Sequence, residues 1–476
     1  MYDNDLKMWN HIFSSEPAID FKSAPFGVIL PHNMIVGYEL TKFYKGLVKV
    51  TNPSVVVVIS PNHYENGDPD IQTCQNCSYE TINGILPLQT DLIQKMVQDG
   101  IAAPFDNTFT KEHGIYNHAP YIRKFFPQAK LVPITLKWET TQEDTVKLSK
   151  WLSANLPEDS LVIGSVDFSH YIPLEAASFH DIASYSTIKN FDYGNMYDLE
   201  IDSPPSISTI THLMEERGFM DAQRFQHTNN QDYHAERVDS TTSHEFIAFF
   251  KGQKQPEKSL TIMSFGNIAD SQSIKNNTDS GLKFYDNYRW NINAANPNTE
   301  INEYLRDIRG YEDRYLVGAD FVVFDLPKNS CQLHEQNGLH ISFCEFNQNG
   351  QIAEQFKTVQ QQKTQGADYI YLLYRFNDLK FIKQDEEIAR MFADHGVSIF
   401  IGRGLKTVIP VENYKNSIIT YSLGDFITEP SVKKSDGEIL EIALTPADQR
   451  TFTFPIQVVN GYPKLITQPL DPHFQK

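Results

Sequence analysis

Residues 54–63 read SVVVVISPNH, an apolar and β-branched run that ends in Pro, Asn and His. A short run of this kind is typical of a strand that is buried on both faces of a sheet. Comparable runs and segments with helical spacing surround it, and they are Phe26–Leu30, Lys130–Thr135 and Ser160–Ser165 for strands, and Leu88–Asp99 and Thr141–Leu156 for helices. This alternation predicts an α/β domain with a largely parallel sheet.

The polar segment Lys251–Lys258 (KGQKQPEK) interrupts this rhythm and is the best linker candidate. Strand-like runs and helical segments restart beyond it, at Leu260–Phe265, Asp320–Phe324, Leu339–Phe343, Glu354–Gln365, Tyr369–Tyr374, Asp385–Asp394, Val397–Ile401 and Ser417–Tyr421. We therefore expect two α/β domains, residues 1–254 and 255–476. A chain of 476 residues is also too long for a single core.

The net charge of −19 disfavours nucleic acid and anionic membranes as partners. The first twenty residues lack the apolar stretch of a secretory signal, and no segment reaches the length of a membrane helix, so we expect a cytoplasmic protein. Four cysteines are too few for a disulfide framework. Cys74 and Cys77 form a CxxC without a second pair for zinc or a thioredoxin-like context, and we expect thiols there; Cys331 and Cys344 are expected to be packing residues.

Eleven of the fifteen histidines precede position 255, so a metal or acid–base site is expected in the first domain. His32 and His63 each follow an apolar run, as do Asp167 and His170 together, and His113 lies in the loop-like segment KEHGIYNHAP. Side chains just past the carboxyl ends of parallel strands can converge. Imidazole suits Zn, Cu, Fe and Ni; Asp167 could orient a ligand, and His113 and His170 could act as general acid–base groups. The alternative for each single histidine is a cap or a surface residue.

Four segments, in this order, resemble those of the MEMO-like family, also called AmmeMemoRadiSam system protein B, whose fold is similar to that of class III extradiol dioxygenases. They are Pro31-His32-Asn33 with Gly37-Tyr38, Ser60–His63, Glu112–Ile115 with His118–Pro120, and Ser165–His170.

This resemblance implies a metal pocket that holds one divalent transition metal, with Fe(II) preferred and Cu or Zn as alternatives. It implies His32 and His63 as two ligands. The family often has a cysteine as third ligand, ahead of a DSS-type segment; this chain has His234 there, ahead of Asp239-Ser240-Thr241. His113, Asp167 and His170 would line the same pocket as catalytic residues.

Residues 259–470 resemble the CapA-type capsule-synthesis proteins, which are similar to calcineurin-like metallophosphatases. Five segments carry the resemblance, namely Leu260–Asp270, Gly318–Pro327, Gly366–Phe376, Gly402–Lys406 and Ile409–Phe426. The positions of the metal ligands hold Asn267, Pro327, Tyr374 and the residues 403–406 (RGLK). Because these residues cannot hold a pair of divalent ions, we expect no catalytic metal in the second domain.

The sequence leaves open whether the chain is an enzyme. One hypothesis is a non-haem-metal oxidoreductase of the dioxygenase type; a metal-dependent hydrolase would use the same ligands. The other is a non-catalytic scaffold or ligand-binding protein in a pathway that modifies a protein or a metabolite. The partner would be a small molecule or a protein, and the family name implies a radical S-adenosylmethionine protein.

Overall fold

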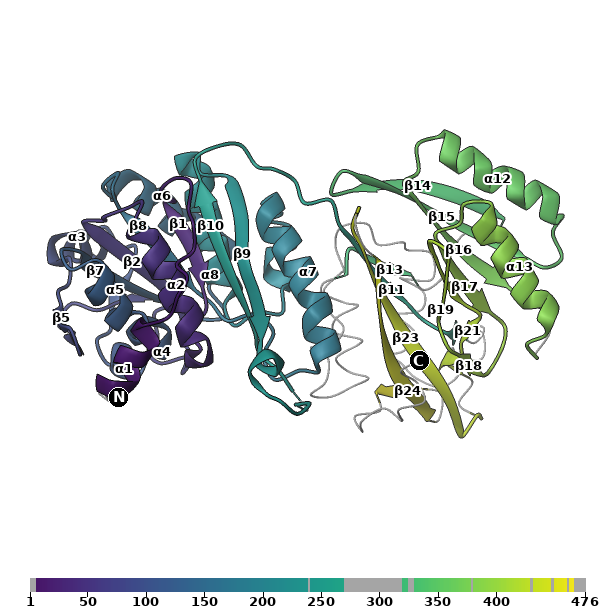
Figure 1. Cartoon of the computed structure of the whole chain (residues 1–476), viewed down its shortest axis with the longest axis horizontal. Coiled ribbons are helices and arrows are strands. Elements are labelled where there is room, and N and C mark those ends of the chain that lie inside the picture. The colour runs from purple at the N-terminus through teal and green to yellow at the C-terminus, as the bar shows by residue number, and fades with distance from the viewer. Residues whose placement is uncertain are drawn as a thin grey trace. The chain divides into compact units, whose positions relative to one another are not determined.

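The computed structural model describes residues 6–238, 240–268, 319–323, 329–377, 380–428, 431–446, 449–459 and 462–465 (Figure 1). Some residues named above lie outside this part of the chain: Asp239, Asp270, Gly318 and Phe324–Pro327. The chain divides into two compact units, Met1–Pro256 and Glu257–Lys476. Within the described residues, no helix is both long and apolar enough to span a bilayer.

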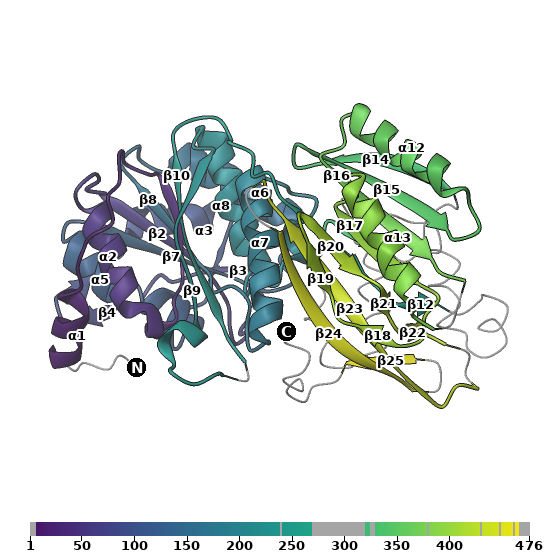
Figure 2. The same ribbon diagram turned by 45° about the vertical axis from the view of Figure 1, so that its right-hand side comes forward.

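The first unit is built on an eight-stranded mixed sheet in the order β6-β3-β7-β2-β8-β1-β10-β9 (Figure 2). The four central strands are parallel, and they are β7 (Lys130–Leu136), β2 (Val55–Pro61), β8 (Leu161–Ser165) and β1 (Gly27–Leu30). Antiparallel pairs join β1 to β10 (Ser243–Phe250), β10 to β9 (Asp221–Asn229), and β7 to β3 (Ile71–Thr73); β6 (Ala103–Pro104) is parallel to β3. The predicted parallel sheet is thus its centre, and the flanks make it mixed.

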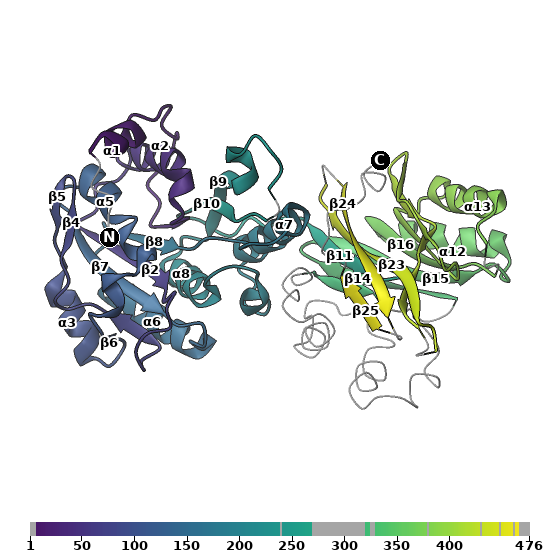
Figure 3. The same cartoon turned by 90° about the horizontal axis from the view of Figure 1, so that it is seen from below.

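Helices cover both faces of this sheet, and Figure 3 shows α1 and α2 on one side and α3 and α6 on the other. Val55, Val57 and Ile59 of β2 pack in one apolar cluster with α3 (Thr90–Gln98), α6 (Gln142–Asn155), α7 (Leu174–Asn190) and α8 (Pro204–Arg217). Val56 and Val58 pack in a second cluster with α1 (Leu6–Phe13), α2 (Gly37–Leu47) and α5 (Ala119–Phe125). All seven residues of β2 are buried, which explains why this run is apolar almost throughout.

Short elements fill the connections of the first unit. A two-stranded ribbon pairs β4 (Tyr79–Thr81) with β5 (Gly84–Leu86). The short helix α4 spans His113–Tyr116. Four 3-10 turns are also present among the described residues of this unit: η1 (Met34–Val36), η2 (Thr108–Thr110), η3 (Met196–Asp198) and η4 (Asn230–Tyr233). His113 therefore opens a helix, whereas the sequence suggested a loop.

The second unit contains two larger sheets. The six-stranded sheet has the order β14 (Ser330–Gln336), β15 (Leu339–Asn347), β16 (Tyr369–Arg375), β17 (Ile399–Arg403), β20 (Ser417–Thr420) and β19 (Glu412–Tyr414). The five-stranded sheet has the order β13 (Phe321–Val323), β11 (Leu260–Ser264), β23 (Lys434–Leu444), β24 (Gln449–Val459) and β25 (Tyr462–Leu465). Two small ribbons pair β12 (Asn267–Ile268) with β22 (Asp425–Ile427), and β18 (Val408–Ile409) with β21 (Ser422–Leu423).

Apolar side chains from both sheets share one core cluster in this unit. The helices α12 (Ile352–Thr364) and α13 (Lys383–Asp394) pack against the other face of the six-stranded sheet (Figure 1). The described parts of the predicted strands and helices lie in or beside these elements. The long antiparallel pair β23–β24 was not predicted.

All four cysteines are paired, so the expectation of free thiols was wrong. Cys331 and Cys344 face each other in register on the antiparallel strands β14 and β15, with 4.1 Å between their Cα atoms. Cys74 and Cys77 close a short loop after β3, with 5.8 Å between their Cα atoms. The separation of 5.8 Å lies within the usual Cα range of a disulfide, about 4.4–6.8 Å, and that of 4.1 Å lies just below it. Neither separation could be predicted from the sequence alone.

Candidate metal centre

His32, His63 and His113 lie together at the carboxyl edge of the central strands, and ligand atoms of the three side chains lie within 4.8 Å of one another. The ring centroids are 4.8 Å apart for His32 and His63, 5.1 Å for His32 and His113, and 3.9 Å for His63 and His113. His32 follows the end of β1 by two residues, and His63 follows the end of β2 by two residues. Because β8 lies between these parallel strands, Asp167, two residues past its end, falls between the two histidines.

Hydrogen bonds at Nδ1 fix which nitrogen of His32 and His63 could bind a metal. Ser165 Oγ donates to the Gly114 carbonyl at 2.6 Å, so its lone pair accepts from His32 Nδ1 at 3.1 Å. His63 Nδ1 lies 2.6 Å from Glu112 Oε1 and donates to that carboxylate. When either ring is neutral, its proton lies on Nδ1 in this arrangement, and Nε2 is the nitrogen that can ligate a metal in place of a proton.

Glu112 is fully buried and organises the loop around His63. Its Oε2 accepts the backbone N–H of His63 at 3.0 Å, and its Oε1 caps α4 by accepting the N–H of Gly114 at 2.9 Å. Burial alone would lower the pKa of His63, but hydrogen bonds to Asp202 and Glu112 raise it to about 10. A Cβ at Gly114 would meet Ser60 Oγ at 1.9 Å, so a larger residue there would force the buried Ser60 side chain to move.

Asp202 is a site residue that the sequence analysis missed. Its Oδ2 lies 3.2 Å from His32 Nε2 and 3.6 Å from His63 Nε2, and it accepts the Asp167 N–H at 3.2 Å. Its Oδ1 is buried and has no hydrogen-bond partner among the described residues. The sequence feature that could have pointed to Asp202 is the segment IDSPPS, which is typical of a helix start. Ser203 caps α8 and Pro204 is its first residue, so Asp202 lies directly before the helix.

Asp167 and His170 both lie in this region. Asp167 Oδ1 accepts the backbone N–H of His32 at 3.0 Å and of Asn33 at 3.3 Å, so it holds the loop after β1. Burial and the neighbouring charge of Asp202 raise the pKa of Asp167 to about 8. Burial first, and then the charges of other histidines including His170, lower the pKa of His32 and of His113.

The structure does not bring His234 to this group. His234 is exposed and follows η4, at the connection between β9 and β10. The Gln231 side chain ties that connection together: its Nε2 donates to the carbonyls of His234 and Glu236, and its Oε1 accepts the N–H of Val238 at 2.8 Å. His113 and Asp202, not His234, lie beside His32 and His63.

The donor set fits a divalent transition metal. Neutral imidazole nitrogens and a carboxylate are ligands that iron, zinc and copper accept in proteins. The unpartnered Oδ1 of Asp202 is a buried anionic atom, which is costly unless a cation or a donor satisfies it. His32, His63 and either Asp202 or His113 could therefore hold one ion.

In the second unit, the residues at the family's ligand positions make structural contacts. Asn267 Nδ2 donates to the Leu405 carbonyl at 2.6 Å, and its Oδ1 accepts the Gly404 N–H at 2.9 Å. Tyr374 packs among aromatic rings, with Phe392 at 5.3 Å between centroids. Arg403 is buried and donates to the Phe265 carbonyl at 3.2 Å. Pro327 lies outside the described residues.

Curated proteins match part of the chain. Among curated proteins, a MEMO1 family protein from Pyrobaculum aerophilum is 26% identical over 242 residues, which are 47% of this chain and 83% of that protein. Another, from Methanothermobacter thermautotrophicus, is 29% identical over 187 residues, 38% of this chain and 67% of that protein.

Two solved structures also align, each at 12% identity. One is a hypothetical protein from Thermus thermophilus, with a TM-score of 0.26 over 41% of this chain and 99% of that one. The other is an uncharacterized protein from Escherichia coli K12, with a TM-score of 0.28 over 46% of this chain and 98% of that one.

Family models account for most of the sequence. A model described as bacterial capsule synthesis protein PGA_cap matches residues 259–430, and one described as Memo-like protein matches residues 3–241, which is half of the chain. The chain therefore belongs to the Memo-like protein family and carries a second domain of the PGA_cap type.

Proposed function

We propose that the Memo-like domain binds one divalent transition metal through His32, His63 and Asp202 and performs non-haem oxidoreductase chemistry of the dioxygenase type. The observation that carries this proposal is that a single carboxylate oxygen, Oδ2 of Asp202, faces the Nε2 atoms of both histidines at 3.2 and 3.6 Å. Two imidazoles and one carboxylate form the donor set of oxygen-activating iron(II) sites, which keep open positions for dioxygen and substrate. Iron(II) is therefore the proposed ion.

The remaining polar residues position the ligands and handle protons in this proposal. Ser165 and Glu112 orient the two rings through Nδ1, which leaves Nε2 as the nitrogen for the metal, and Asp167 holds the backbone of His32. The side chain of His113 is 34% exposed, so a substrate could reach it beside His63. His113 is the proposed general acid–base group, with His170 as its neighbour.

The position of His113 favours a second candidate. Because His113 lies in the same group as His32 and His63, three imidazoles could hold zinc and leave a fourth position for water, which suits a hydrolase. In either case we propose that the partner is a small molecule or a protein. A radical S-adenosylmethionine protein is one such partner, proposed from the family resemblance alone.

Elemental analysis of protein purified anaerobically without chelator tests both candidates. Wild type, Asp202→Asn and His113→Asn are compared, with His234→Ala as the matched control. Iron near one equivalent that is lost in Asp202→Asn and kept in His113→Asn supports the oxidoreductase. Zinc that is lost in His113→Asn favours the hydrolase. No metal in the folded wild type would leave a non-catalytic scaffold as the better interpretation.

A further inference from the structure

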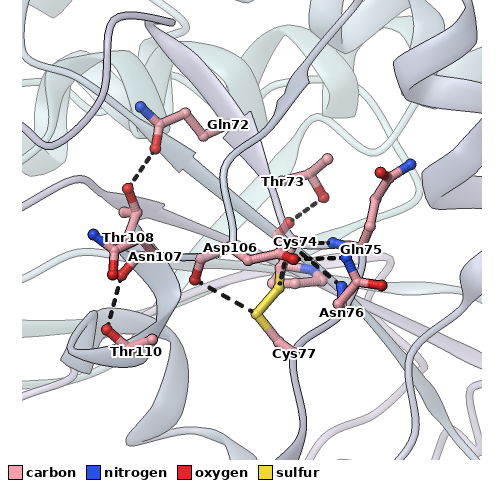
Figure 4. The surroundings of a disulfide bond; sticks show 11 residues. Gln72, Thr73, Cys74, Gln75, Asn76, Cys77, Asp106, Asn107, Thr108 and Thr110 are labelled. Atoms are coloured by element: carbon pink, nitrogen blue, oxygen red, sulfur yellow. Dashed lines mark hydrogen bonds between the residues drawn. A yellow bond between two sulfur atoms is a disulfide. The ribbon is translucent and has the colours of Figure 1, made fainter.

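The Cys74–Cys77 disulfide closes a loop that is clamped by one carboxylate, and Figure 4 shows Asp106 beside both cysteines. Asp106 Oδ1 accepts the backbone N–H of Gln75 at 2.8 Å and of Asn76 at 3.4 Å, and Oδ2 accepts Asn76 Nδ2 at 2.8 Å. The loop between the cysteines is thus bound from two sides, by its own disulfide and by Asp106.

The two sulfur atoms differ in their surroundings. Cys74 is fully buried in the core under α1, α2 and α5, whereas Cys77 is half-buried at its edge. An incoming thiol could therefore reach Cys77 and not Cys74. Cys74 Sγ lies 3.2 Å from Asp106 Oδ1, so a reduced Cys74 would find an acceptor for its S–H already in place. Both the disulfide and the dithiol are accommodated by this arrangement.

A continuous set of contacts connects this loop to the candidate metal centre. Strand β3, which precedes Cys74, pairs in parallel with β6, and the Phe105 N–H donates to the Thr73 carbonyl at 3.0 Å. Thr108 Oγ1 donates to Gln72 Oε1 at 2.6 Å inside the protein. The same segment then runs through η2 to Glu112, whose carboxylate orients His63. Asp106 therefore ties the start of the segment 105–113 to the disulfide loop, and the end of the same segment supplies Glu112 and His113.

We propose that Cys74–Cys77 is a reversible thiol–disulfide site, opened by a dithiol reductant at Cys77, and that its state controls how firmly residues 105–113 hold the metal centre. A reductant thiolate attacks Cys77 Sγ, the Cys74–Cys77 bond breaks, and Cys74 Sγ leaves with the electron pair and takes a proton. The second reductant thiol, as thiolate, then displaces Cys77 Sγ, which is protonated in turn. Two electrons and two protons pass to the protein, and the reductant becomes a cyclic or protein disulfide.

The second disulfide offers a matched comparison within the same chain. Cys331–Cys344 joins neighbouring strands β14 and β15 in the other unit, which does not contain the candidate metal centre. Cys344 is fully buried and Cys331 is half-buried, the same division as in the first pair, so the two disulfides differ in the carboxylate beside the sulfur and not in exposure. A general effect of losing a disulfide should appear in Cys331→Ser/Cys344→Ser, whereas an effect that passes through Asp106 should appear only in Cys74→Ser/Cys77→Ser.

The first experiment equilibrates the metal-free full chain with mixtures of reduced and oxidised dithiothreitol and labels free thiols for mass spectrometry. Because Asp106 would accept the S–H of a reduced Cys74, we expect Cys74–Cys77 to open at a lower ratio of reduced to oxidised reagent than Cys331–Cys344, with Cys77 forming the mixed disulfide. Opening of Cys331–Cys344 first, or a mixed disulfide at Cys74, would overturn the assignment. Zinc bound stoichiometrically by the reduced wild type and not by Cys74→Ser/Cys77→Ser would also overturn it, because Cys74, Cys77 and Asp106 would then form a metal site.

The second experiment measures hydrogen exchange of residues 105–116 and the metal dissociation constant in wild type and both double variants. We expect at least about tenfold faster exchange and about 5-fold or greater weakening of metal binding in Cys74→Ser/Cys77→Ser only, a typical size for coupling between sites. The metal part rests on the proposed function, but hydrogen exchange does not. Unchanged exchange refutes the switch, whereas an absence of metal from all three proteins with altered exchange refutes only the proposed function.

Discussion

Replacing the buried Glu112 by glutamine should weaken metal binding by about 5- to 150-fold without unfolding the domain. Oε1 of Glu112 accepts from His63 Nδ1 at 2.6 Å and from the Gly114 N–H at 2.9 Å, and Oε2 accepts the His63 backbone N–H at 3.0 Å. A glutamine amide has one oxygen, so one of these donors would face an NH2 group. Losing the partner that orients a ligating histidine typically costs about 10- to 100-fold in metal affinity, which lies within the stated range.

The alternative for the variant is a change of tautomer, which has the same consequence. If His63 accepts from the new amide at Nδ1, its proton moves to Nε2, the nitrogen that faces Asp202. A metal must then displace that proton, so binding is weakened in this case too.

The assay is a metal titration of stripped wild type, Glu112→Gln and a control, followed by competition with a chelator of known affinity. His227→Gln is the control, because His227 also pairs with a buried carboxylate, with Nε2 at 2.7 Å from Asp181, outside the candidate metal group. The control should keep the wild-type dissociation constant. A folded Glu112→Gln protein whose dissociation constant stays within about twofold of wild type would refute the role given to Glu112.

Three further predictions concern Asp202, His227 and Leu152. Asp202→Asn should lower the bound metal by at least about tenfold, a typical cost for disturbing a metal shell, while His234→Ala leaves it unchanged, as elemental analysis would show; equal loss in both would restore His234 as a ligand. Burial opposes a charge on His227, but its hydrogen bond to Asp181 raises its pKa from 6.5 to about 9, so the pair stabilises fully below pH 6.5 and this contribution disappears as the pH rises through 9. Urea unfolding should therefore show the stability advantage of wild type over His227→Gln falling by about 1–2 kcal/mol between about pH 6 and 10, a value reduced for partial exposure; a constant difference would contradict the ion pair. Leu152→Ala should cost about 2–5 kcal/mol in the same unfolding assay, because Leu152 is fully buried in the cluster under α6, and a cost below about 1 kcal/mol would contradict that packing.

The centre of the first domain could be predicted because its strands are buried on both faces and lie parallel to one another. The run that forms β2 is buried at every position since helices cover both faces, and the residues two places beyond β1, β2 and β8 meet because those strands are parallel and adjacent. The antiparallel flanks were harder to foresee. Strand β9 is only partly buried and has the composition of a polar segment, so its apolar signal is weak.

The ligand set could be predicted only in part. Asp202 follows no strand, and it reaches the histidines because α8 begins beside them, which depends on how that helix packs. His234 was inferred from its order along the family pattern, and such an order does not fix the path of a turn that is closed by Gln231. The disulfides depend on Cα separations and strand register, neither of which is written in a sequence.

The order of the strands in the first domain also determines when the protein can become functional during synthesis. Gly27 of β1 pairs with Val162 of β8 and with Phe249 of β10, so β1 has no partner until the ribosome has made more than a hundred further residues. Strand β2 likewise waits for β7 and β8. Pairing over such distances is slow, and an unpaired β2 exposes a VVVVI segment that favours aggregation. The sheet of the first domain should therefore stay open until Phe250 has emerged, and the loop that carries His32 should settle only when β8 and β10 have paired with β1.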